Sequence, residues 1–172
     1  GKFSGCSNYF VIAGNSKQAD LALCAGYHGE QLVLYAQHLG LNTCWTALTH
    51  GTIPNTFTLC DDEKVVIYIA LGYGATQGVQ HPQKKKDTDL SNILPGEDNW
   101  FAQGVRAAML APTAVNQQKF YIKAERNADG IPTGKVHLTA RFSLIGYQQL
   151  DLGIVRYHFE VAAGKENFTW VI

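Results

Sequence analysis

The sequence predicts one α+β domain over residues 1–172. Three observations lead to this fold class: a β-branched run at 65–71, a helical pattern at about 20–39, and two strand patterns at 119–125 and 135–141 that flank a turn with glycines. Consecutive strands joined by a hairpin, with helices elsewhere in the chain, are typical of an α+β sandwich. With 172 residues, of which 46% are hydrophobic, the chain can bury one substantial core, and no linker-like composition shift divides it.

The first half of the chain is expected to hold two strands and a long helix. Residues 9–13 form a short apolar run that ends at a Gly-Asn turn, as a buried strand would. The helical pattern is strongest from about 20 to 39, and Gly40 suits the left-handed residue that follows a helix. The spacing predicts one buried helix face, made by Leu32, Tyr35, Ala36 and Leu39. The run at 65–71 is typical of a central strand covered on both faces.

The second half begins with a polar loop at 72–96, whose length indicates a function or mobility. A helix is expected to follow, with Asp98 as its N-cap. Its buried face would contain Phe101, Val105, Ala108 and Met109. After the hairpin, a last helix carries apolar residues at helical spacing, namely Leu150, Ile154, Tyr157 and Val161. This helix is expected to close at Gly164, before a strand at 168–172.

Composition and charge exclude several classes of protein. The formal net charge is zero and the pI is about 7.2, so no electrostatic surface for a nucleic acid or an acidic membrane is expected. No apolar run reaches the roughly 20 residues that span a bilayer, and no signal peptide is recognised. The four cysteines lack zinc-type spacing, so we expect no metal site and reduced thiols in a cytoplasmic protein. The chain opens at Gly1 without a Met, and an N-terminal segment is expected to be missing.

The segment 110–120 is the most informative stretch for function. Pro112 disfavours continued helix at the residue before it, so the polar side chains that follow are expected in a turn between a helix and a strand. The amides of Asn116 and Gln118 each offer two donors and an acceptor, which suits the edge of a flat heteroaromatic ring or a polyol. The same two side chains could instead stabilise the turn itself.

This segment resembles the Ala-Pro-Ser-x-x-Asn-x-Gln-Pro-Trp signature of the FMN-dependent nitroreductase family, with Thr113 in place of the Ser. Residues 29–45 resemble the family's long helix, its Leu-Gly-Leu-Gly turn and the Thr-Cys-Trp that leads to the flavin ring edge. Residues 67–73 resemble its Ala-Leu-Gly-Tyr strand end, which a basic loop at 84–86 follows. Joint matches are more specific than any one of them. The resemblance implies a three-layer sandwich with a central mixed, mostly antiparallel sheet flanked by helices.

The resemblance also implies which residues bind the cofactor. Contacts to the ring edge and ribityl chain of FMN would come from Thr113, Asn116 and Gln118. Backbone N–H groups directed to the N5 and O4 edge would come from Cys44, Trp45, Thr46 and Ala47. The phosphate would be held by Lys84 and Lys86. The flavin carries the chemistry in such proteins, so no catalytic side chain is expected.

The implied activity is the reduction of a nitroaromatic, quinone or similar flat acceptor by NAD(P)H, in a homodimer that binds FMN.

Several of the proposed cofactor-binding residues also have plain structural interpretations. Trp45 could be a core aromatic residue, and the loop at 84–86 could simply be solvated. Asp151 and His158 are spaced for one face of the last helix, where a surface or capping pair is expected in preference to a catalytic dyad.

Two features depart from the usual pattern of that family. Most members begin with a helix that ends in Arg-Arg-Ser-x-Arg, whose arginines hold the flavin phosphate and ring, and nothing here matches that string. The Asn-x-Gln motif also follows the Leu-Gly-Leu turn instead of preceding it, an order that resembles a smaller branch of nitroreductases with rearranged or duplicated halves. These departures keep open a flavin-free binding or interaction module on the same fold. A third hypothesis is other flavin chemistry, such as reductive dehalogenation or ring cleavage.

Overall fold

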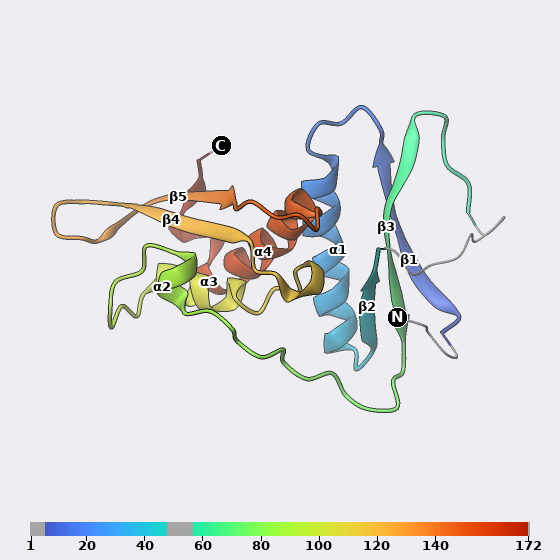
Figure 1. Ribbon diagram of the computed structural model, residues 1–172, viewed down its shortest axis with the longest axis horizontal. Coiled ribbons are helices and arrows are strands. Elements are labelled where there is room, and N and C mark those ends of the chain that lie inside the picture. Colours follow the sequence, from blue (N-terminus) through green and yellow to red (C-terminus); the bar gives the residue numbers. More distant parts are fainter. Residues whose placement is uncertain (1–5, 48–56, 172) are drawn as a thin grey trace.

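The computed structural model describes residues 6–47 and 57–171, and it confirms the α+β class (Figure 1). The elements along the chain are β1 (Asn8–Asn15), α1 (Leu21–His38), β2 (Asn42–Thr46), β3 (Glu63–Gly72), α2 (Asp87–Leu90), α3 (Trp100–Ala108), the 3-10 turn η1 (Ala114–Asn116), β4 (Phe120–Arg126), β5 (Pro132–Ala140), α4 (Gln148–Ala163), the 3-10 turn η2 (Lys165–Asn167) and β6 (Thr169–Trp170). The strands predicted at 9–13 and 65–71, the hairpin and the three longer helices are confirmed, whereas β2 and α2 were not predicted.

The described strands form two three-stranded sheets. In the first sheet, β3 lies between β1 and β2 and is antiparallel to both. In the second, β5 lies between β4, which is antiparallel to it, and β6, which is parallel. Helix α1 lies along the first sheet and packs on α4, which in turn contacts α3 and β5 (Figure 1). Helices α1 and α4 therefore lie between the two sheets, and the expected three layers about one central sheet are not confirmed.

Glycines allow α1 and α4 to approach with their backbones almost in contact. A Cβ atom added to Gly26 would lie 2.0 Å from the carbonyl oxygen of Leu150, and one added to Gly153 would lie 2.0 Å from that of Leu23. The buried face of α1 is therefore made mostly of small residues: Leu21, Ala25, Gly26, Gly29, Glu30, Val33 and Ala36. The predicted face was wrong except at Ala36, because Leu32, Tyr35 and Leu39 are exposed.

The main core lies between α3, α4 and the second sheet. Its largest side chains are fully buried, among them Phe101, Phe120, Ile122, Val155 and Phe159. The Phe159 ring contacts Phe101 in an edge-to-face geometry, with the ring centroids 6.0 Å apart. Aromatic pairs of this kind contribute roughly 0.5–1.5 kcal/mol beyond the area that they bury.

Helix α3 begins one residue later than the sequence predicted. The side-chain oxygen of Asn99 accepts hydrogen bonds from the N–H groups of Phe101 and Ala102, at 3.0 and 3.1 Å. Asn99 is therefore the N-cap, and Asp98 instead pairs with Arg106 at 2.9 Å on the surface. Asp and Asn are nearly equal as N-caps, so the sequence alone does not separate neighbouring candidates.

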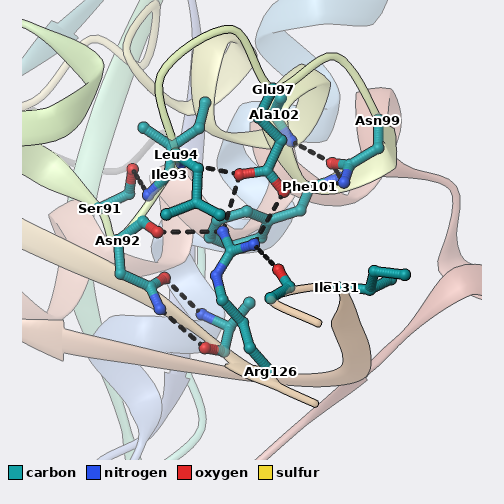
Figure 2. A network of polar contacts seen from close by, with 12 residues as sticks. Ser91, Asn92, Ile93, Leu94, Glu97, Asn99, Phe101, Ala102, Arg126 and Ile131 are labelled. Carbon is teal, nitrogen blue, oxygen red and sulfur yellow. Dashed lines mark hydrogen bonds and ion pairs between the residues drawn. The ribbon is translucent and has the colours of Figure 1, made fainter. Parts of the chain in front are cut away.

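Arg126 on β4 fixes the segment 91–99, which leads into α3. Figure 2 shows its guanidinium between the carboxylate of Glu97, the carbonyl oxygen of Asn92 and the turn of the hairpin. The Arg126 Nη2 to Glu97 Oε2 distance is 2.8 Å, and both side chains are largely buried. Hydrogen bonds from Arg126 lower the pKa of Glu97 against the opposing effect of burial, which is the larger single contribution. This pair ties the start of α3 to the second sheet.

Candidate functional site

A cavity of about 550 Å³ lies where the first sheet, α1, the turn after α3 and the beginning of α4 meet. Residues of α1, β2 and β3 form one wall, made by Val33, Thr43, Cys44, Trp45, Ala47 and Ile67. The turn forms a second wall at residues 112–116. The third wall comes from the beginning of α4 and the loop before it, with Ile145, Tyr147, Leu150, Asp151 and Ile154. The volume lies within the range of roughly 300–1,000 Å³ found for small-molecule sites.

The turn that forms the second wall is held in an unusual backbone conformation. After Pro112, Val115 and Asn116 have φ of 46° and 53°, and Gln118 has φ of 48°. The Asn116 N–H donates to the carbonyl of Thr113 at 2.7 Å, and the Gln118 N–H donates to the Thr113 hydroxyl at 3.0 Å. Non-glycine residues in the left-handed region cluster at ligand-binding and catalytic sites, because only a constrained surrounding can maintain them. The conformation therefore favours a functional role for this turn.

Asp151 of α4 fastens this turn to the helix. Its carboxylate accepts hydrogen bonds from the Ala114 N–H at 2.8 Å and from the Gln117 amide at 2.7 Å. The side chain is 4% exposed, and burial raises its pKa from 3.8 to about 6, against the smaller opposing effect of the two hydrogen bonds. The cavity thus contains a carboxyl group that changes charge near neutral pH.

Trp45 is positioned by a buried polar group on α1. Its indole N–H donates to Glu30 Oε2 at 3.2 Å, and the other carboxylate oxygen contacts His158 Nε2 at 2.8 Å. A Cβ atom on Gly29 would lie 2.4 Å from the indole ring, so only glycine leaves room for this ring position. His158 and Asp151 consequently have different partners and are both buried, so they form neither a dyad nor a surface pair, although Asp151 does accept a hydrogen bond from the backbone N–H of Ala114.

The structure brings together five of the nine residues that the sequence proposed for cofactor binding. The lining of the cavity includes Cys44, Trp45, Ala47, Thr113 and Asn116. Two separate segments of the sequence therefore meet at one cavity, and the role of these five residues in cofactor binding stays a prediction.

The other four proposed residues lie outside the lining. Thr46 is buried, and its hydroxyl donates to the Tyr68 carbonyl at 3.1 Å. Gln118 is also buried, and its amide donates to the Ala111 carbonyl and to the Asn116 side chain, both at 3.0 Å. Lys84 and Lys86 are exposed. Their role in cofactor binding stays a prediction.

Sequence reasoning passed over Lys85, which is the lysine that contacts the turn. Its ammonium group donates to the backbone carbonyls of Gln117 and Gln118, the latter at 2.5 Å. Burial lowers the pKa of Lys85, and the charges of Lys119 and Arg141 add to this effect. Reasoning from motifs also missed the α4 wall, although the placement of Asp151 within an apolar helix face was an available signal.

The comparison with known families decides where the chain belongs. Residues 1–163 match the model of the family described as "Putative TM nitroreductase". The chain belongs to this family. No curated protein matches it.

A solved structure supports the fold. The chain is similar to the crystal structure of a "putative nitroreductase" from Thermotoga maritima, with a TM-score of 0.62 and 23% sequence identity. The similarity covers 90% of this chain and 64% of that one, so this chain spans less than two thirds of the length of that protein. At this identity the likeness shows the fold alone.

The residues present fit a flat ring better than they fit the phosphate of a flavin nucleotide. Apolar walls with a few polar groups at the rim suit an isoalloxazine. Within the described part of the chain, however, no Lys, Arg or His lines the cavity.

In residues 6–47 and 57–171, no helix is long and apolar enough to cross a membrane, and no cluster of three or more His, Cys, Asp or Glu could hold a metal ion. All four cysteines are free thiols.

Proposed function

We propose that this nitroreductase-family chain is an oxidoreductase that reduces a nitroaromatic, quinone or similar flat acceptor with NAD(P)H, using FMN or a related flavin. The observation that carries the proposal is the meeting of Cys44, Trp45 and Ala47 with Thr113 and Asn116 around one cavity. These residues come from the two motifs that resemble the flavin-binding segments of the family. A bound flavin supplies the hydride chemistry, and the protein supplies its binding and orientation.

The cavity walls suggest how each group contributes. The indole of Trp45, held by Glu30, provides a fixed apolar surface beside the ring. Asn116 offers an amide at the rim, where the strained turn holds it in place. Leu150 and Ile154 of α4 close the far wall and exclude water from it. We propose that Thr46, Gln118, Lys84 and Lys86 contribute indirectly or at the edge of the site.

Flavin binding and reduction test this function directly. The purified protein is incubated with FMN or riboflavin and desalted, and its visible flavin absorption is recorded before and after NADH or NADPH is added under anaerobic conditions. We expect retained flavin that is bleached by the nicotinamide and reoxidised by a quinone or nitroaromatic compound. Size-exclusion chromatography with light scattering tests the proposed homodimer.

A cavity-filling variant separates this site from any other flavin-binding surface. Ala114→Trp places an indole in the lining of the cavity, whereas the control Ala140→Trp places it on an exposed residue at the end of β5. The first variant should lose flavin and the second should keep it. A wild-type protein that folds and retains no flavin would favour the alternative function, a flavin-free binding or interaction module.

A further inference from the structure

The charge of the cavity lining is unusual for a site that would bind a nucleotide. Among the described residues that line the cavity, Asp151 alone has a formally charged side chain at neutral pH, and that charge is negative. Its carboxylate accepts hydrogen bonds from two neutral groups, the Ala114 N–H and the Gln117 amide. Among the described residues, no salt bridge to Asp151 is formed. The ionised carboxylate therefore has no positive charge beside it to offset a bound anion.

The nearest basic segment is directed to other partners. The ammonium group of Lys85 donates to the carbonyls of Gln117 and Gln118, and Lys84 and Lys86 are exposed residues outside the lining of the cavity. Of the residues outside the described ranges, Lys2 is the one Lys or Arg in the sequence. Among the described residues, none that lines the cavity therefore carries a positive charge that offsets the charge of Asp151.

We propose that this cavity selects a neutral flat ligand over an anionic one, and that Asp151 is the residue that determines this specificity. The inference rests on the proposed function where the ligand is a flavin, and it then states that riboflavin binds at least as tightly as FMN. For the acceptor, it states that an uncharged quinone binds more tightly than the same ring with a sulfonate group.

Coulomb's law sets the expected size of the selection. We consider a ligand that places a unit negative charge about 10 Å from the carboxylate, at an effective dielectric constant of about 20 and low ionic strength. Its dissociation constant should be about tenfold higher than that of its neutral counterpart. At physiological salt the Debye length is about 8 Å, so the factor should fall to about twofold. The selection should therefore weaken measurably when salt is added.

Two pairs of probes test the inference. Dissociation constants are measured for riboflavin and FMN by flavin fluorescence, and for a naphthoquinone and its sulfonate by calorimetry. Each pair is measured with the wild type, with Asp151→Asn and with the control Asp98→Asn, which changes an exposed carboxylate on the loop before α3. We expect the wild type and the control to prefer the neutral member of each pair, and Asp151→Asn to reduce the preference by about two- to tenfold, depending on the salt concentration.

A pH series on the wild type provides a test that needs no variant. Burial raises the pKa of Asp151 to about 6, so the preference for the neutral quinone should be full at about pH 8 and mostly lost at about pH 5. A sulfonate keeps its charge throughout this range, so the ligand does not contribute to the change. Besides Asp151, the titratable side chains among the described residues that line the cavity are Cys44 and Tyr147, and both are retained in the Asp151→Asn variant.

The outcomes separate the inference from the proposed function. Tighter binding of FMN and of the sulfonate, unchanged in Asp151→Asn, would overturn the inference and leave the oxidoreductase standing. If neither flavin binds but the neutral quinone is preferred and the preference depends on Asp151, the flavin function fails and the selection by charge stands. A folded protein that binds none of the four probes would overturn both.

Discussion

Replacing Asp151 by Asn is expected to change the pH dependence of folding stability. Burial raises the pKa of this carboxyl from 3.8 to about 6 in the folded protein. The folded state therefore binds the proton more tightly than the unfolded state does. The stability that this provides is fully present below about pH 3.8 and is lost as the pH rises through 6.

The shift from 3.8 to about 6 corresponds to about 3 kcal/mol, at 1.36 kcal/mol per pKa unit. About 2 kcal/mol of this is lost between about pH 4.5 and 7.5. The Asn side chain does not titrate, so the wild type should lose about 2 kcal/mol relative to Asp151→Asn over the same range. A constant offset is also expected, because the Asn amide presents a donor where the carboxylate accepted a hydrogen bond. The test is therefore the pH dependence of the stability difference between the wild type and the variant, and the constant offset between them is not used.

Urea unfolding at several pH values measures this slope. The carboxylates of Glu97 and Glu160 titrate in the wild type and in the variant alike, so their contributions cancel in the difference. The control is Asp129→Asn, which changes an exposed residue in the hairpin turn. Its unfolding free energy, plotted against pH, should run parallel to that of the wild type. If the curve of Asp151→Asn also runs parallel, Asp151 is not a destabilising buried charge, and the account of its pKa is refuted.

Three further substitutions test the packing that positions the cavity, each by the free energy of unfolding. Gly26→Ala should destabilise the fold by about 3 kcal/mol or more because its Cβ would overlap a carbonyl of α4, whereas Gly72→Ala, with open space around it, should be nearly neutral. Arg126→Met should cost about 3–5 kcal/mol because it leaves a buried carboxylate unpaired. Its control, Arg106→Met, breaks a surface pair and should change stability by about 0.5 kcal/mol or less. Asn99→Ala should cost about 1 kcal/mol as the loss of an N-cap, and no loss would contradict that assignment.

Hydrophobic periodicity predicted where α1 begins and ends but not which of its faces is buried. The pattern favoured Leu32, Tyr35 and Leu39, since large apolar residues usually mark the core. The buried face instead consists largely of glycine and alanine, because close approach of α1 and α4 needs small side chains at Gly26 and Gly153. Close packing between two helix backbones depends on the partner helix, which one segment of sequence does not contain.

The candidate site was predicted in part for a related reason. Both motif segments were recognised because their residues are contiguous, and the cavity contains members of each. The third wall, with Tyr147, Leu150 and Asp151, comes from a helix far along the chain and carries no motif. The lysines show the same limit: sequence order suggested Lys84 and Lys86, but the chain path brings Lys85 onto the turn. Contacts between distant segments decide such details, and they follow from the tertiary fold.

The backbone strain at Val115 gives one more test of whether the turn serves a ligand. Val115 has φ of 46° and ψ of 27° and is 74% exposed, so the hydrogen bonds of the neighbouring residues Ala114 and Asn116 hold the turn, and packing of the Val115 side chain contributes little. A residue with a Cβ loses roughly 1–2 kcal/mol in this region, while glycine costs roughly 0.5–1 kcal/mol in unfolded-state entropy. Val115→Gly should therefore leave the unfolding free energy unchanged or raise it by about 1 kcal/mol. Val161→Gly, at a 60% exposed position inside α4, should lower it by about 0.5 kcal/mol. Equal losses in both variants would show that Val115 is not strained. A more stable Val115→Gly protein that binds the ring less tightly would show that the strained conformation is maintained for the ligand.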